Sequence, residues 1–277
     1  MDVTIVYFSQ TGNTKKVAEA MVSGFEQAGH PVRTIPLKKA TSDDVLKSDL
    51  MGVGTPCFAS QAPTPVKEYL RSLPALNGRR AFVFATSGGA PGTVLYDLTR
   101  ILSSKGADVI GGELFRGELR HPVPCLKGRF PGRPNAEDLA LARRFAIAVA
   151  QNVSGTPRLR LTQTRPDALK ATWGFYRLVS VMSRDRMVRL LFPEPRLIKS
   201  KCDQCQWCVH ACPMDNIIME PNPVLGDRCI RCYRCLTGCP QKAFDANWRL
   251  GNLVALLLYN TTFERWFGDV KPGERFY

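Results

Sequence analysis

The first half of the chain alternates between two spacings of apolar residues. Short apolar runs are typical of buried strands, and apolar positions three or four residues apart are typical of helices. We expect strands at residues 3–8, 32–36, 50–54, 80–86 and 108–114. We expect helices at residues 13–28, 64–72, 93–104 and 136–153.

This alternation of strands and helices restricts the topology. A strand, a crossover helix and a second parallel strand are connected with right-handed geometry, so the helices cover both faces of a parallel sheet. Five such strands predict an α/β fold, a doubly wound parallel sheet with strand order 2-1-3-4-5. In sheets of this kind, ligands bind outside the carboxyl ends of the strands.

The rest of the chain follows no such alternation. Residues 115–134 are rich in Gly, Pro and Arg, which indicates a long loop of the kind that often carries function. Residues 156–201 hold eleven Lys or Arg against three acidic residues, a net charge of +8. The same segment has an approximately helical apolar stripe at Trp173, Tyr176, Val179, Met182, Met187, Leu190 and Leu191. A further helix is expected at residues 248–259.

Composition changes this picture little. The 277 residues allow two modest domains, and 44% hydrophobic with 22% charged residues is ordinary for a globular protein. No apolar run reaches the roughly 18 residues that a membrane span needs, and the sequence begins without a basic, cleavable leader. We therefore expect a cytoplasmic protein.

Eight of the ten cysteines form two runs with identical spacing, Cys-x-x-Cys-x-x-Cys-x-x-x-Cys-Pro. In order, the members are Cys202, Cys205, Cys208 and Cys212, then Cys229, Cys232, Cys235 and Cys239. A cubane iron-sulfur cluster needs four thiolates, three from a tight loop and a fourth from elsewhere in the fold. A pair of zinc sites is the alternative, but zinc gives no reason for a third loop cysteine or for the trailing Cys-Pro.

The spacing resembles that of two-cluster ferredoxins, in which the fourth cysteine of each run ligates the other cluster. The resemblance implies that one 4Fe-4S cluster is held by Cys202, Cys205, Cys208 and Cys239. It implies that a second 4Fe-4S cluster is held by Cys229, Cys232, Cys235 and Cys212. Nearby cations stabilise a reduced cluster, so we predict the higher potential for the second cluster, which has three interleaved arginines, Arg228, Arg231 and Arg234.

A polar loop follows the first strand and opens directly into a helix. Its residues are Ser9, Gln10, Thr11, Gly12, Asn13 and Thr14. Backbone N–H groups and the positive end of a helix attract an anion, and these side chains can bond the oxygens of a phosphate monoester without a lysine. The loop is neither a Walker A motif nor Gly-x-Gly-x-x-Gly, so it does not support nucleoside triphosphate or dinucleotide binding. The alternative is a polar turn that only caps the helix.

The Thr-Gly-Asn-Thr sequence resembles the phosphate loop of the flavodoxin family, and the resemblance extends from residue 3 to about 150. It implies a flavodoxin-like fold with bound FMN. One loop that would contact the isoalloxazine ring contains Thr55, Pro56, Cys57 and Phe58. The other contains Thr86, Ser87, Gly88, Gly89 and Gly92. Neither loop has the Trp or Tyr pair that often sandwiches the ring in flavodoxins, so we expect a more exposed ring beside Phe58.

The whole chain is similar to the flavodoxin–ferredoxin fusion proteins of anaerobic bacteria and archaea. The implied parts are an FMN domain at 1–155, a basic helical connector at 156–201, a small α+β two-cluster ferredoxin-like domain at 202–246 and a helical tail at 247–277. The resemblance implies electron transfer between FMN and two 4Fe-4S clusters, converting two-electron to one-electron flow for a redox partner protein. No acid–base catalytic residue is required.

Two other functions stay open. An exposed flavin suits a reductase of a small organic acceptor such as a quinone. The basic connector and the apolar tail suit an electron-delivery subunit of a larger complex, peripheral to the inner face of a membrane. We interpret the connector's apolar stripe as packing between domains, and its charge as attraction to a partner with an acidic docking surface. No motif supports nucleic-acid binding, and Cys57, Cys125 and His121 are given no role.

Overall fold

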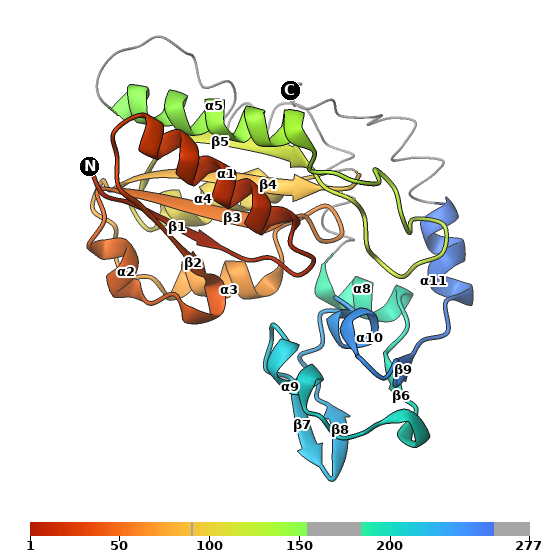
Figure 1. Ribbon diagram of the computed structural model, residues 1–277. Coiled ribbons are helices and arrows are strands. Elements are labelled where there is room, and N and C mark those ends of the chain that lie inside the picture. The colour runs from red at the N-terminus through yellow and green to blue at the C-terminus, as the bar shows by residue number, and fades with distance from the viewer. Residues whose placement is uncertain (90, 154–183, 258–277) are drawn as a thin grey trace. The chain divides into compact units, whose positions relative to one another are not determined.

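The computed structural model describes residues 1–89, 91–153 and 184–257 (Figure 1). The chain forms two compact units. Among the described residues, the first unit contains 1–118 and 130–153, and the second contains 119–129 and 184–257. No helix within these ranges is long and apolar enough to cross a membrane.

A five-stranded parallel sheet forms the centre of the first unit. Its strands are β1 (Val3–Tyr7), β2 (Val32–Pro36), β3 (Leu50–Pro56), β4 (Arg80–Ser87) and β5 (Asp108–Arg116). The order across the sheet is β2-β1-β3-β4-β5, and every pairing is parallel, which confirms the predicted topology. The order reverses between β1 and β3, so the carboxyl ends of these strands form a topological switch point.

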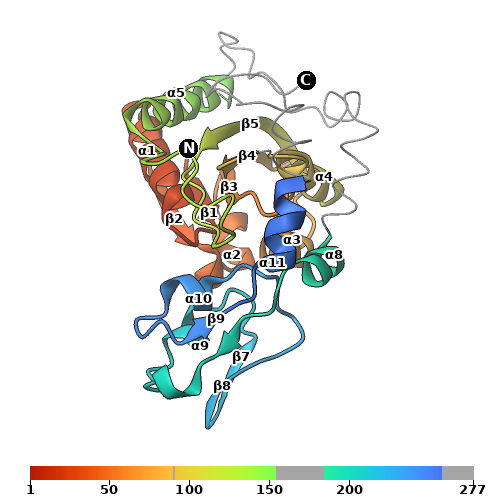
Figure 2. The ribbon, with the colours of Figure 1, turned by 90° about the vertical axis from the view of Figure 1, so that its right-hand side faces the viewer.

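Helices cover both faces of the sheet (Figure 2). On one face lie α1 (Asn13–Gln27) and α5 (Ala136–Val153). On the other lie α2 (Ser42–Leu46), α3 (Thr64–Ser72) and α4 (Val94–Ser104), with a 3-10 turn η1 (Leu37–Lys39). Every strand and helix predicted for this unit is present, with each end within two residues of its expected position.

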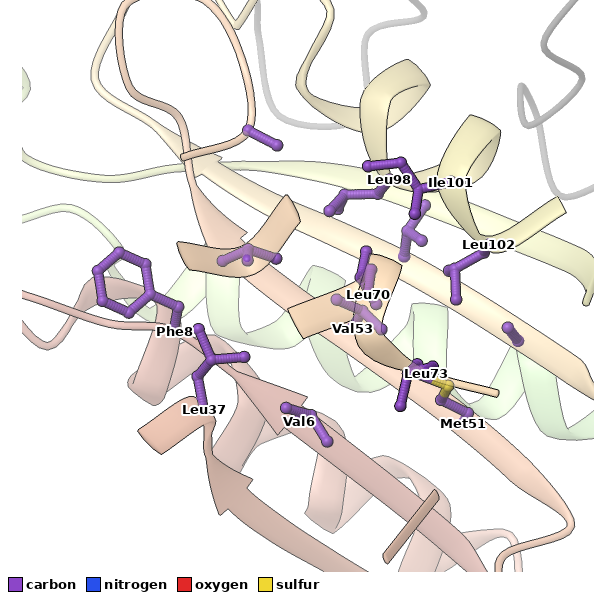
Figure 3. Packing of buried hydrophobic residues seen from close by; sticks show 14 of the residues in the cluster. Val6, Phe8, Leu37, Met51, Val53, Leu70, Leu73, Leu98, Ile101 and Leu102 are labelled. Atoms are coloured by element: carbon purple, nitrogen blue, oxygen red, sulfur yellow. The ribbon is translucent and has the colours of Figure 1, made fainter. Parts of the chain in front are cut away.

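The two faces of the sheet pack differently. On the side of α3 and α4, aliphatic residues such as Val53, Leu70 and Leu98 form a buried cluster (Figure 3). On the side of α1 and α5, the Phe84 ring lies across β3, where a Cβ at Gly54 would come within 2.1 Å of it. Glycine therefore makes room for a buried ring, and burying a side chain of this size contributes about 1.5–3 kcal/mol.

The second unit is a small α+β fold, as predicted. Its elements are α8 (Asp185–Leu191), β6 (Arg196–Leu197), η2 (Lys199–Lys201), α9 (Trp207–Ala211), β7 (Ile217–Glu220), β8 (Asn222–Leu225), α10 (Arg234–Gly238), β9 (Phe244–Asp245) and α11 (Arg249–Val254). Of the amphipathic connector helix expected around residues 173–191, only α8 falls within the described residues. The expected tail helix begins with α11, and its last two residues, 258 and 259, lie outside the described part.

Candidate functional site

Three loops that the sequence marks as a binding site follow β1, β3 and β4, which are neighbours in the sheet. Hydrogen bonds join these loops. The hydroxyl oxygens of Thr14 and Thr86 lie 2.9 Å apart, and the Cys57 N–H donates to the Thr86 carbonyl oxygen at 2.8 Å. The fold therefore brings the loops together at the carboxyl edge of the sheet.

The first loop ends at Gly12, where α1 begins. Gly12 has a φ of 93°, a conformation that glycine adopts without steric cost, and a Cβ there would have no atom within 4 Å. The Lys16 N–H closes the first helical bond to the Gly12 carbonyl at 3.0 Å, and the Lys15 N–H donates to Ser9 Oγ at 3.3 Å. The first N–H groups of a helix have no partner within the helix, so this end of α1 suits an anion.

The side chains of this loop differ in their exposure to solvent. Thr11 is exposed and Ser9 and Gln10 are partly buried, whereas Asn13 and Thr14 are buried. The Asn13 side-chain amide donates to the Glu118 carbonyl at 3.0 Å and so ties α1 to the segment that follows β5. The first turn of α1 contains no acidic residue. Hydroxyls and backbone N–H groups without a carboxylate fit a phosphate monoester.

The second loop is a tight turn over residues 58–61. Phe58 and Gln61 exchange both backbone hydrogen bonds at 2.9 Å. Between them, Ala59 and Ser60 have φ values of 45° and 64°, as in a two-residue hairpin turn. The turn presents Phe58, which is partly buried and packs edge-on against Phe8 with ring centroids 6.1 Å apart.

An acidic residue that sequence reasoning missed supports this turn. Asp97, on the first turn of α4, accepts a hydrogen bond from the Ala62 N–H at 3.0 Å and one from Thr93 Oγ1 at 3.4 Å. Burial raises the pKa of the Asp97 carboxyl. The available signal was an acid inside an otherwise apolar helical pattern, between Leu95 and Leu98.

Cys57 gives this loop a neutral sulfur. Its thiol donates to the Pro91 carbonyl at 3.3 Å, and burial raises the pKa of the thiol to about 12. The thiol therefore stays protonated near neutral pH and is a poor nucleophile. A neutral thiol followed by an aromatic residue is chemically compatible with the flat, largely apolar ring of a flavin.

The third loop is shaped by short hydrogen bonds around Ser87. Ser87 Oγ donates to the Gly89 carbonyl at 2.9 Å and accepts from the Gly89 N–H at 3.2 Å. The Ser87 carbonyl accepts from the Gly117 N–H at 3.1 Å, which joins this loop to the end of β5. Gly88 lies inside this turn, and Gly92 has a φ of 60°. Thr55 and Pro56 end β3 beneath the loops, and Thr55 is fully buried.

In the second unit, the eight cysteines of the two runs line two cavities. One has an open volume of about 280 Å³ and is lined by Cys202, Cys205, Cys208 and Cys239. The other has an open volume of about 360 Å³ and is lined by Cys212, Cys229, Cys232 and Cys235. Each cavity thus joins three cysteines of one run to the last cysteine of the other, which is the combination expected of two-cluster ferredoxins.

The pairing of short strands places the last cysteine of each run beside the other run. β6 precedes the first run and pairs with β9, which follows the second run. β7 follows the first run and pairs with β8, which precedes the second run. Each antiparallel pair therefore carries the last cysteine of one run to the loop of the other.

The two halves repeat at an interval of 27 residues. The Asn216 N–H donates to Cys212 Sγ and the Ala243 N–H donates to Cys239 Sγ, both at 3.4 Å. Hydrogen bonds to sulfur stabilise a thiolate ligand. No three His, Cys, Asp or Glu side chains of the described residues converge as a single metal ion requires. The eight cysteines line two cavities, four in each, and this arrangement fits clusters of several irons.

The three arginines of the second run have different surroundings. Arg231 donates to Glu194 Oε1 at 2.7 Å. Burial opposes the charge of Arg231, but hydrogen bonds to Glu194 and Cys229 outweigh it and raise the pKa of the guanidinium. The Arg234 guanidinium lies over the Trp207 ring, 5.2 Å from its centroid, and Arg228 is exposed. Arg231 therefore acts directly on a cysteine of the cluster loop.

Comparison with known proteins agrees with both halves of this description. A flavodoxin domain model matches residues 4–158, and a 4Fe-4S dicluster domain model matches residues 201–244. A flavodoxin of Megasphaera elsdenii is 30% identical over 112 residues, which are 39% of this chain and 82% of that protein. The putative diflavin flavoprotein A 5 of Nostoc sp. is 25% identical over 169 residues, 59% of this chain and 27% of that protein. A solved flavodoxin from the domain Archaea covers 56% of this chain and 99% of its own, with 23% identity and a TM-score of 0.46.

The two domain models match consecutive parts of the chain, and the flavodoxin model covers more than half of it. They imply FMN as the cofactor of the first domain and 4Fe-4S clusters as the cofactors of the second, and with them an electron-transfer role. The chain therefore belongs to the flavodoxin family and is a flavodoxin–ferredoxin fusion.

Proposed function

We propose that this chain relays electrons between FMN and an external redox protein, and that it converts two-electron flow into one-electron flow. The observation that carries the proposal is the distribution of eight cysteines over two cavities in a chain that also has a flavodoxin domain. Bound FMN exchanges either two electrons or one, whereas each 4Fe-4S cluster passes one.

We assign the candidate site residues three roles: binding the FMN phosphate, flanking the flavin ring and ligating the clusters. The start of α1, with Ser9, Gln10, Thr11, Gly12, Asn13 and Thr14, binds the FMN phosphate. The loops with Thr55, Pro56, Cys57 and Phe58 and with Thr86, Ser87, Gly88, Gly89 and Gly92 flank the isoalloxazine ring. One cluster is ligated by Cys202, Cys205, Cys208 and Cys239, and the other by Cys229, Cys232, Cys235 and Cys212.

The external protein presents an acidic surface. The basic segment 156–201 supports this part of the proposal through its net charge of +8. Lys199 and Lys201 are exposed immediately before Cys202, and Lys242 is exposed beside Cys239. Complementary charge increases the rate of encounter with a partner more than the final affinity.

The first experiment is anaerobic purification of the full chain with measurement of bound flavin and iron. We expect one FMN and about eight iron atoms per chain, the content of two cubane clusters. Material that contains zinc in place of iron, or that binds no flavin, would end the proposal.

A ligand variant then tests the relay. Cys229→Ser should abolish electron transfer from reduced FMN to an external one-electron acceptor and leave the absorbance of bound FMN unchanged. Cys125→Ser is the matched control, because Cys125 lies outside both cavities, and it should retain transfer. Unchanged transfer in Cys229→Ser, or turnover of a quinone by that variant at the rate of the unmodified chain, would favour a flavin reductase instead.

A further inference from the structure

The loop that follows β5 is divided between the two units. Its stem belongs to the first unit, where the Glu118 N–H donates to the Arg133 carbonyl at 2.9 Å. Arg133 also pairs with Asp138, which is fully buried at the start of α5. Residues 119–129 belong to the second unit, and their base is closed by the Leu119 N–H, which donates to the Arg129 carbonyl at 2.9 Å. We call residues 119–129 the excursion.

The excursion is packed firmly within the second unit. Val123 and Leu126 form a hydrophobic cluster with Ala255, just after α11. The Cys125 N–H donates to Asn252 Oδ1 at 2.9 Å. A segment continuous with the edge of the flavodoxin sheet is therefore part of the core of the unit that carries the cysteine runs.

His121 of the excursion reaches the second cysteine run. Its ring packs edge-on against three aromatic rings, and the nearest is Tyr233, with centroids 5.0 Å apart. The Val123 N–H donates to His121 Nδ1 at 3.3 Å and helps to fix the orientation of the ring. We call His121, Phe192, Tyr233 and Trp248 the aromatic cluster.

Tyr233 connects the aromatic cluster to a cysteine cavity. It follows Cys232 directly and lines the cavity of the second run. Its side chain is 1% exposed, its hydroxyl donates to the Pro193 carbonyl at 2.7 Å, and its ring centroid lies 4.7 Å from that of Trp248. Tyr233, in the loop of the second run, is thus buried against residues contributed in part by the excursion.

The loop of the first run is open to solvent. The counterpart of Tyr233, 27 residues earlier, is Gln206, which has a similar left-handed φ of 60° but is exposed. Cys205 is exposed, whereas its counterpart Cys232 is partly buried. The two loops have a similar backbone conformation at this position, but the residue there is exposed in the first run and buried in the second.

We infer that the two clusters have fixed places in the relay. The second-run cluster, on Cys212, Cys229, Cys232 and Cys235, exchanges electrons with the flavodoxin domain. The first-run cluster, on Cys202, Cys205, Cys208 and Cys239, exchanges electrons with the external redox protein. This inference rests on the proposed function and adds the order of the clusters to it.

Main-chain continuity supports this order. The Glu118 carbonyl accepts a hydrogen bond from Asn13 at the start of α1, and the main chain runs from Glu118 to His121, which contacts Tyr233 beside Cys232. Reduced FMN holds two electrons and would lose them one at a time: for each electron that the flavin loses, the second-run cluster gains one and passes it to the first-run cluster. The first-run cluster then reduces a one-electron redox protein, and the proton released by FMN passes to water. Flow in the opposite direction uses the same order.

Two ligand variants at corresponding positions test the order in the full, cofactor-loaded chain. In Cys205→Ser, photoreduced FMN should still reduce the second-run cluster, seen by its EPR signal, while transfer to an external one-electron protein falls at least about tenfold. In Cys232→Ser, transfer from FMN to the remaining cluster should fall at least about tenfold, while an external reduced protein still reduces that cluster. The reverse pattern, or equal loss of both steps in both variants, would overturn the order.

A second measurement keeps all cluster ligands. Tyr233→Gln gives the second loop the residue of the first and should slow the FMN-to-cluster step at least about fivefold, with the external step unchanged. Gln206→Ala is the matched control and should leave the FMN-to-cluster step unchanged. An equal effect of the two substitutions on that step would contradict the inference.

The exposure of each cluster to solvent can be measured without following electron transfer. A soluble gadolinium chelate should enhance the EPR relaxation of the cluster left in Cys232→Ser more than that of the cluster left in Cys205→Ser. Equal enhancement would count against an outer first-run cluster. Failure of the unmodified chain to bind iron would instead refute the proposed function, so the two failures are distinguishable.

Discussion

The hydroxyl oxygens of Thr14 and Thr86 lie 2.9 Å apart in a buried position, one on α1 and the other near the end of β4. Thr86 also accepts the Cys57 N–H through its carbonyl oxygen. Thr86 therefore contacts the start of α1 and joins the two loops that are proposed to flank the flavin ring. We expect the geometry of the proposed FMN site to depend on this pair.

Thr86→Val should weaken FMN binding. The substitution leaves the Thr14 hydroxyl buried without its partner, which costs about 1–3 kcal/mol. The double variant Thr14→Val, Thr86→Val should recover part of that loss of stability, because neither buried polar group remains. Fluorescence titration of the flavin-free chain with FMN and thermal unfolding measure both effects, and strictly additive losses would show that the two hydroxyls act independently.

Gly12→Ala should reduce FMN affinity more than it reduces stability. A residue with a side chain in the left-handed conformation costs about 1–2 kcal/mol, and at position 12 the resulting strain would displace the N–H groups that are proposed to bind the phosphate. Gly29→Ala is a close control, because Gly29 has a φ of 79°, lies after the other end of α1, and would likewise have no atom within 4 Å of an added Cβ. Both variants should lose similar stability, and similar FMN affinities for the two would refute a special role for Gly12.

The apolar spacing was sufficient to predict the doubly wound sheet, because the three central strands β1, β3 and β4 are almost entirely buried and the long helices have an apolar face. It did not predict α2, since five residues are too few for a helical period to show. Thr41 and Asp44 cap this helix with reciprocal hydrogen bonds, which is a local signal that was available. The excursion could not be predicted, because chain order places residues 119–129 between two elements of the flavodoxin domain.

Some candidate site residues could be predicted from the sequence, because their chemistry requires a fixed spacing. The cysteine runs and the polar loop after β1 are of this kind. Asp97 and Tyr233 could not be found in this way, because their roles depend on contacts between segments distant in the sequence. The sequence also could not show which way each of the interleaved arginine side chains points. Arg231 turns toward Cys229 and Glu194, whereas Arg234 stacks on Trp207.

Arg231→Gln should lower the reduction potential of the second-run cluster. The substitution removes a cation and a hydrogen bond to Cys229, both of which favour the more negative, reduced cluster. A tenfold change in the equilibrium corresponds to about 59 mV for one electron, and we expect a shift of this order. Arg228→Gln removes the same charge from an exposed position and should shift the potential less in an EPR-monitored redox titration. Equal shifts would mean that only net charge matters.

Replacing Lys199 and Lys201 with Gln should slow electron exchange with an acidic partner protein at low ionic strength. The two lysines are exposed next to Cys202, and attraction between exposed charges acts mainly on the rate of encounter. The difference from the unmodified chain should shrink in high salt, where such charges are screened. Lys39→Gln, an exposed change in the flavodoxin domain, should have no comparable effect in stopped-flow measurements. A salt-independent difference would exclude electrostatic docking at these lysines.

The stability of the flavodoxin domain should fall as the pH rises past neutral, because of Glu113. Burial on β5 raises the pKa of this carboxyl from 4.5 to about 7, although the Leu114 N–H donates to its Oε1 and opposes the shift. The folded state therefore holds the proton more tightly than the unfolded state. The stabilisation is fully present below about pH 4.5 and is lost as the pH rises through about 7.

Glu113→Gln should remove this pH dependence, because the amide stays neutral. The side chain is partly buried, so we expect the unmodified chain to lose about 1–3 kcal/mol relative to the variant between pH 5.5 and 8.5. Thermal release of FMN, followed by flavin absorbance at several pH values, measures the difference. Glu26→Gln, at an exposed position on α1, should keep the slope of the unmodified chain. If Glu113→Gln keeps that slope as well, the carboxyl at position 113 is not the titrating group.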